Sequence, residues 1–178
     1  MQLDEAIKNR RSAKKFSSKK PDWRDIMECI DAARYAQRAG GHFTLKFIFV
    51  SDPEKISRIA EAAQQDFISQ AHYIVVVFSL PKITINSFGK RGEIYVRQQA
   101  GAAIQNFLLK AEEKKLAACW VGHFVDEQIK REFKIPDAAL IEAVIPVGYE
   151  FEKTKPSKKT VIDSILYFDR FGKKRMKG

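Results

Sequence analysis

The chain has 178 residues, of which 45% are hydrophobic and 30% are charged, a balance typical of one globular domain rather than of a disordered chain. No apolar run approaches the roughly 20 residues of a membrane-spanning helix, since the longest covers only residues 73–80. The first residues lack the basic-then-apolar pattern of a secretory leader. These features predict a cytoplasmic protein that is not inserted in a membrane.

The net charge of +10 leaves three classes of partner open: a nucleic acid, an anionic membrane surface and an anionic small molecule. Basic residues concentrate at 10–20 and 153–159, but charge alone does not decide among these classes. Cys29 and Cys119 lie far apart in the chain, and the three histidines are scattered. The sequence therefore predicts two reduced, buried cysteines and no metal site.

Helical and strand patterns alternate irregularly along the chain, which predicts an α+β domain rather than a regular βαβ series. Helices are predicted at residues 3–9 and 22–36, after Asp52 through Ala63, at 93–115, and from Asp126 through Phe133; strands are predicted at 45–50, 73–80, 116–121, 140–147 and 161–168. The basic stretch 89–92 is expected to be a loop before the long helix. We expect a single domain over residues 1–178 with a flexible tail at 171–178. The fingerprints of dinucleotide-binding and P-loop proteins are missing from the sequence.

A basic cluster follows the first predicted helix. It comprises Arg10, Arg11, Ser12, Lys14 and Lys15. Guanidinium groups and a hydroxyl supply the forked, charge-assisted hydrogen bonds that hold a phosphate dianion. Taken by itself, the cluster is also compatible with an exposed basic turn.

Residues 9–16 resemble the RRS-x-R-x-F signature of the nitroreductase family of flavoproteins. Further segments resemble motifs of that family in the same order: residues 32–40 before a core strand, Tyr95 with residues 99–106, residues 116–124, 145–149 and 156–159. Residues 116–124 are similar to the stretch GLGxCWxGxF, and residues 145–149 to the strand end iPxGyP. The resemblance covers nearly the whole chain.

The resemblance implies a nitroreductase-like fold, in which helices flank a mixed or antiparallel central sheet and a homodimer exchanges its C-terminal segments. It also implies FMN bound at the subunit interface. The reaction that it implies is a ping-pong transfer of hydride from NADH or NADPH through FMN to a nitro compound, a quinone or a related acceptor. Because the flavin carries the chemistry, no catalytic side chain is expected, nor any nucleic-acid or membrane partner.

The residues that the resemblance assigns to FMN fall into three groups. The phosphate-binding group comprises Arg10, Arg11, Ser12 and Lys14, joined by Lys158 and Lys159; the backbone of Val121 and Gly122 lies beside the reactive ring nitrogen; Arg38 and Gly41 stand at the pyrimidine edge. An amide donor beside the ring nitrogen stabilises the reduced, anionic flavin.

Several positions depart from the family pattern. The usual Ser-x-x-Asn-x-Gln at the pyrimidine edge reads Arg38, Gly41 and Phe43 here, and only Arg38 retains a polar side chain. Gln99 stands where many members have Asp. Trp120 and Phe124 are interpreted as packing residues, with a substrate pocket as the alternative.

Other functions remain open at this point. One is a specialised flavin enzyme of the same fold that cleaves a ring or removes a halogen, and another is a flavin-binding protein without reductase activity. A nucleic-acid-binding module is disfavoured, because the sequence contains no recognisable DNA- or RNA-binding motif.

Overall fold

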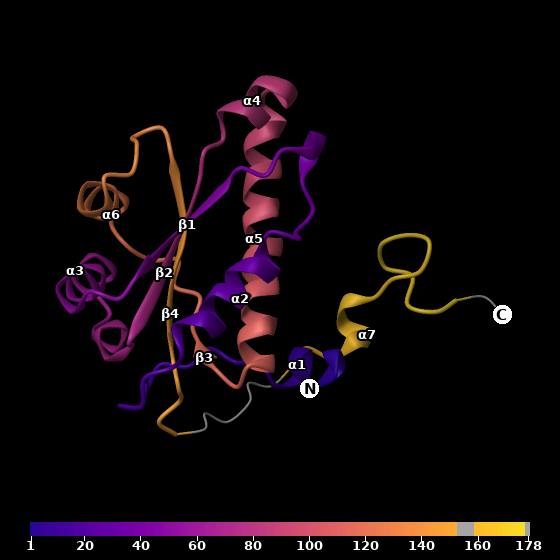
Figure 1. The fold of residues 1–178 in the computed structure, drawn as a ribbon. Helices are drawn as coiled ribbons and strands as arrows, with labels where there is room; N and C mark the ends of the chain where they lie inside the picture. Colours follow the sequence, from indigo (N-terminus) through magenta and orange to yellow (C-terminus); the bar gives the residue numbers. More distant parts are fainter. Residues whose placement is uncertain (153–158, 177–178) are drawn as a thin grey trace.

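The computed structural model describes residues 1–152 and 159–176, in which helices cover both faces of one antiparallel sheet (Figure 1). The helices are α1 (Leu3–Asn9), α2 (Trp23–Ala33), α3 (Pro53–Ala63), α4 (Lys82–Phe88), α5 (Lys90–Glu113), α6 (Asp126–Phe133) and α7 (Ile162–Ile165), with 3-10 turns η1 (Ala39–Gly41) and η2 (Asp66–Gln70). The strands are β1 (Leu45–Val50), β2 (Tyr73–Ser79), β3 (Ala117–Ala118) and β4 (Leu140–Gly148). They pair in the order β1-β2-β4-β3. The α+β prediction is confirmed.

Strand β2 lies inside the sheet and separates two hydrophobic cores. All of its residues are buried, because side chains alternate between the two faces and helices cover both. Val75 and Val77 face the core formed with α2 and α5, whereas Ile74 and Val76 face the core formed with α3 and α6. This double burial accounts for the continuous apolar run in the sequence.

The predicted loop at residues 89–92 is wrong, because the long helix α5 already begins at Lys90. Only Gly89 separates it from α4, in a backbone conformation with φ 55° and ψ −143° that glycine adopts readily. The two helices pack closely at Gly92, where a Cβ atom would lie 2.5 Å from the Thr84 carbonyl oxygen. The glycines therefore form a tight elbow between two helices instead of a loop.

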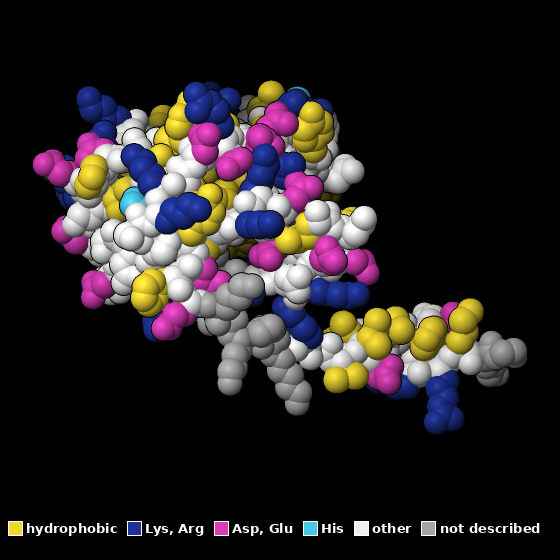
Figure 2. Space-filling view, turned by 60° about the horizontal axis from the view of Figure 1, so that its bottom comes forward, with side chains coloured by type: hydrophobic (Ala, Val, Ile, Leu, Met, Phe, Trp, Pro, Cys, Tyr) yellow, Lys and Arg dark blue, Asp and Glu magenta, His cyan; other side chains and the backbone are white. Residues whose placement is uncertain are grey.

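The C-terminal arm, residues 159–176, projects away from the rest of the molecule (Figures 1 and 2). The strand predicted at 161–168 is wrong: the arm contains the short helix α7, since no strand in the described part of the chain lies beside it to pair with. Its apolar side chains are exposed, including Ile162, Ile165 and Phe171, the last of them 87% exposed. An isolated chain thus leaves a row of large apolar side chains in solvent.

None of the helices in the described part of the chain combines the length and the apolar character needed to span a bilayer.

Replacing Gly92 with alanine is expected to lower the free energy of unfolding by about 1–3 kcal/mol, since the added Cβ forces α4 and α5 apart. The matched control is Gly101→Ala in the same helix, where the nearest atom to the added Cβ is 3.9 Å away. That change should raise stability by about 0.5–1 kcal/mol through helix propensity. Urea unfolding measures the stability of both variants. Equal changes in their free energy of unfolding would rule out a close α4–α5 contact.

Candidate functional site

Residues after α1 run in an extended conformation along the edge of the sheet. Ser12 forms a parallel bridge with Ala118, and the Ala13 N–H donates to the Ala118 carbonyl at 3.1 Å. Farther along, the Ser17 N–H donates to the Tyr149 carbonyl at 2.8 Å. Side chains of an extended segment alternate between its two sides. Successive residues of the basic cluster therefore point in opposite directions, and alternate residues point in the same direction.

By this alternation Arg10, Ser12 and Lys14 lie on one side of the segment, which is the side of Cys119. Burial raises the pKa of the Cys119 thiol, while a hydrogen bond with Ser12 and the nearby charges of Lys14 and Arg10 act in the opposite direction. The Lys14 ammonium also lies 5.8 Å from the centre of the Phe67 ring. Neither Arg10 nor Lys14 has a carboxylate of the described residues within ion-pairing distance. Two unneutralised cations and a hydroxyl on one side of the segment fit a phosphate group.

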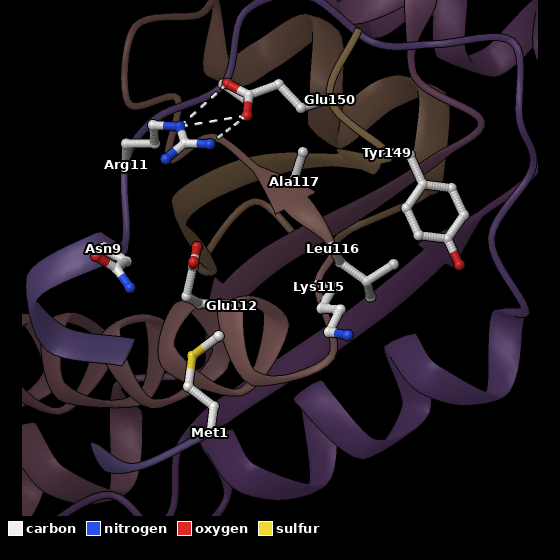
Figure 3. Close-up of a pocket in the computed structure, with 10 residues that line it drawn as sticks. Met1, Asn9, Arg11, Glu112, Lys115, Leu116, Ala117, Tyr149 and Glu150 are labelled. Carbon is white, nitrogen blue, oxygen red and sulfur yellow. Dashed lines mark hydrogen bonds and ion pairs between the residues drawn. The ribbon is translucent and has the colours of Figure 1, made fainter. Parts of the chain in front are cut away.

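Arg11 points to the opposite side, where it pairs with Glu150 (Figure 3). Its Nη2 donates to Glu150 Oε2 at 2.6 Å, and its Nε lies 3.2 Å from both carboxylate oxygens. These hydrogen bonds raise the pKa of the Arg11 guanidinium. The pair lines a cavity of about 550 Å³ together with Asn9, Glu112 and Tyr149. The structure thus separates Arg11 from the other residues assigned to the phosphate.

Beyond β3, Val121 and Gly122 differ in what their backbone amides do. The Val121 N–H donates to the Val144 carbonyl at 3.0 Å, and the Val144 N–H donates back to Val121 at the same distance. The Gly122 N–H has no hydrogen-bond partner among residues 1–152 and 159–176. Apart from its two chain neighbours, none of the described residues has an atom within 4 Å of the position that a Gly122 Cβ would take. Of these two amides, that of Gly122 is the available donor, with open space beside it.

Gly41 ends the turn η1, which leads toward β1, and Arg38 immediately precedes that turn. Gly40 and Gly41 have φ values of 59° and 75°, a backbone region that favours glycine. Both Arg38 and Gly41 are exposed. In the sheet order, β1 and β3 are the two edges, with two strands between them. The turn itself contacts α4 and α5, so Arg38 and Gly41 lie beside these helices, ahead of the edge strand β1.

Gln99 fixes this turn, a role that the sequence did not reveal. Its side chain is buried; Oε1 accepts from the Thr44 N–H at 2.9 Å and from Thr44 Oγ1 at 2.8 Å, and Nε2 donates to the His42 carbonyl at 2.9 Å. An amide can accept and donate at once, whereas an aspartate in this position only accepts. The signal in the sequence is a polar residue on the otherwise apolar face of α5, beside Val96 and Ala103.

The remaining residues named from the sequence have varied environments. Lys158 lies outside the described residues, and Lys159 is exposed at the start of the C-terminal arm. Phe43 and Phe124 are partly buried against the two cores, as the packing interpretation expects. Trp120, by contrast, is 40% exposed, with its ring next to Gly101 of α5.

Comparison with known proteins gives a consistent result. A family model described as the nitroreductase family matches residues 7–71 and 61–149. A protein of Methanothermobacter thermautotrophicus, provisionally named NADH dehydrogenase/NAD(P)H nitroreductase, is 29% identical over 167 residues, which are 92% of this chain and 84% of the relative.

Solved structures agree in fold. The crystal structure of a nitroreductase family protein from Clostridium novyi NT has a TM-score of 0.78 at 28% identity, covering 97% of this chain and 96% of its own. A structure from Clostridium difficile R20291, named an FMN-dependent nitroreductase, has a TM-score of 0.82 at 22% identity, covering 94% and 99%. Because the family match spans most of the chain and the fold agrees, the chain belongs to the nitroreductase family and is an oxidoreductase.

Proposed function

We propose that the protein is an FMN-dependent oxidoreductase that takes hydride from NADH or NADPH and reduces a nitro compound, a quinone or a related acceptor in a ping-pong reaction. The observation that carries the proposal is the line of donors along one sheet edge. Arg10, Ser12 and Lys14 lie at one end, beside Ala118, and the Gly122 amide, which no described residue pairs, lies four residues farther along. Four residues of extended chain advance roughly 13 Å, a span that a phosphate, its ribityl chain and a ring edge can bridge.

Each of these groups has a role that follows from its chemistry. Arg10 and Lys14 neutralise the phosphate dianion, and the Ser12 hydroxyl adds a hydrogen bond. The Gly122 amide donates to the ring edge, where it stabilises the charge of the reduced ring. FMN, when bound, supplies the hydride chemistry, so the protein needs no general base at this place. Arg11 is left out of the phosphate-binding set, because Glu150 already holds its guanidinium.

We also propose that two chains form each flavin site. Arg38 and Gly41 precede β1, and Gly122 follows β3, which is the opposite edge strand of the sheet; we infer that one chain does not bring both groups to the same ring. In this proposal a second copy of the chain supplies Arg38 and Gly41 to the pyrimidine edge of the flavin. The exposed apolar side chains of the C-terminal arm support this assembly, since burial against a second chain removes them from water (Figure 2). Lys158 and Lys159 join the phosphate site in this proposal.

The function is tested by anaerobic reduction of the FMN-loaded protein. We expect NADH or NADPH to bleach the visible flavin absorbance, and a nitroaromatic compound or a quinone to restore it. A protein that remains colourless and shows no thermal shift with FMN contradicts the proposal. Bound flavin that neither nucleotide reduces leaves only the flavin-binding role.

The variants Arg10→Ala and Arg11→Ala separate the two sides of the basic segment. Arg10→Ala is expected to weaken FMN binding about ten- to hundred-fold, because a charge-assisted hydrogen bond to the phosphate is lost. Arg11→Ala should leave FMN affinity within about two-fold, since its guanidinium pairs with Glu150 instead. Titration of flavin fluorescence measures both constants. Equal losses in the two variants would show that the phosphate lies elsewhere.

Replacing Gln99 with leucine is expected to lower the free energy of unfolding by about 2–3 kcal/mol, because Thr44 and His42 lose a buried partner. Amide hydrogen exchange should accelerate at Thr44, and FMN affinity should fall as η1 loses its fixed shape. The control is Gln98→Leu on the exposed side of the same helix, which should change stability by less than about 0.5 kcal/mol. Unchanged exchange at Thr44 in the Gln99 variant would remove Gln99 from this role.

A further inference from the structure

Glu142 is the extra residue of a bulge in strand β4. The pairing of β2 with β4 slips by one residue where Val77 pairs with Ala143 and Phe78 pairs with Ile141, which leaves Glu142 without an opposite residue. A bulge re-aims the side chain of its extra residue, and bulges are frequent beside functional sites. The Glu142 carboxylate is consequently directed away from the regular ladder.

The Glu142 carboxylate is buried and bonded through both oxygens. Its side chain is 5% exposed; Oε1 accepts from Ser79 Oγ at 2.6 Å and Oε2 accepts from Arg97 Nη1 at 2.8 Å. Ser79 is itself fully buried in β2. The side chain of Arg97, on α5, is 47% exposed. Glu142 therefore holds the Arg97 side chain in place from its buried side. A guanidinium has more N–H groups than this one contact uses, so Arg97 retains hydrogen-bond donors on its exposed side.

The helix places Arg97 next to Trp120. Arg97 stands four residues before Gly101 on α5, which is about 6 Å along the axis on the same side of the helix. A Cβ atom on Gly101 would lie 3.9 Å from Trp120 Cη2. The Arg97 position and the Trp120 ring over Gly101 are therefore about one helical turn apart on the same face of α5, and both side chains are partly exposed.

The strand pairing also places the Arg97–Glu142 pair near Gly122. Glu142 is two residues from Val144, and Val144 exchanges both backbone hydrogen bonds with Val121. Gly122, whose amide is unpaired among the described residues, follows Val121. The Arg97–Glu142 pair is thus beside the segment that ends the proposed flavin site, within on the order of 10 Å of Gly122.

We propose that this chain selects aromatic acceptors that carry a carboxylate, with the acceptor ring on Trp120 and its carboxylate on the fork of Arg97. The inference rests on the proposed function, because it puts the acceptor beside the flavin. A planar guanidinium matches a carboxylate with two parallel hydrogen bonds, and an indole offers a flat apolar face to an aromatic ring. Glu142 is a positioning residue that acts through Arg97, and Ser79 holds Glu142 in turn.

A purely structural ion pair between α5 and β4 makes a different prediction. Breaking such an ion pair changes the free energy of unfolding, but it does not change the relative affinities for charged and neutral ligands. The discriminating quantity is therefore the ratio of affinities for two ligands of the same shape. Benzoate and benzamide form such a pair, since they differ chiefly in the carboxylate charge.

The test measures the dissociation constants of benzoate and benzamide by calorimetry, together with kcat/KM for 4-nitrobenzoate and 4-nitrobenzamide in the FMN-loaded protein. The unaltered protein is expected to prefer the carboxylate by about ten-fold. Arg97→Gln should bring the ratio to within about two-fold of unity, and Arg97→Lys, which keeps the charge opposite Glu142, should retain an intermediate preference. If Arg97→Gln does not fold, the ratio of affinities is measured on Arg97→Lys instead.

The matched control is Arg58→Gln, which breaks another arginine–glutamate pair on the far face of the sheet. Arg58 Nη1 lies 2.7 Å from Glu132 Oε2, between α3 and α6. This variant should leave the carboxylate preference unchanged. Equal affinities for the two ligands in the unaltered protein, or a loss in Arg97→Gln that is the same for both, would overturn the inference.

The two proposals fail in different ways. If neither NADH nor NADPH reduces bound flavin, the proposed function fails, but calorimetry with benzoate and benzamide still decides whether Arg97 selects a carboxylate. If the flavin turns over 4-nitrobenzamide and 4-nitrobenzoate equally well, the function stands and the selectivity of Arg97 is refuted.

Discussion

The backbone pairing of residues 12–17 with β3 and with the end of β4 is the constraint on which the candidate site depends. Because this segment is extended, its side chains alternate, and a continuous basic sequence is divided into two groups with different partners. Phe16 anchors the segment, and it fits because Gly148 has no side chain: a Cβ there would lie 2.8 Å from the Phe16 ring. A glycine in β4 thus helps to set the direction in which Arg10 and Lys14 point.

Much of the fold could be predicted from the sequence because single elements carried strong patterns. The unbroken apolar run of β2 and the capped helix α3 were visible in this way, and both lie where their patterns placed them. The elbow at Gly89 and the arm around Ile162 were mispredicted for opposite reasons. Glycines usually mark loops, but a close contact between two helices also requires them. The strand-like pattern of the arm has no neighbouring strand among residues 1–152 and 159–176.

The candidate site was predictable in composition but not in geometry. The resemblance named Arg11 with its neighbours, yet the alternation that directs it to Glu150 depends on a strand partner more than a hundred positions away. The same holds for Val121, whose amide is used by Val144 across the sheet. Gln99 and Glu142 were not recognisable as functional from the sequence, since the role of each consists of contacts with distant backbone and with side chains on other elements.

Arg38 precedes β1 and Gly122 follows β3, the two edge strands of the sheet, and this separation has a genetic consequence. In the proposed dimer, each flavin site takes its phosphate end from one subunit and its pyrimidine edge from the other. A subunit damaged only at Arg10 and a subunit damaged only at Arg38 therefore complement each other when they pair. One site of such a mixed dimer carries both defects, and the other is built entirely from intact residues. Two inactive alleles of this gene would then restore activity when they are expressed together.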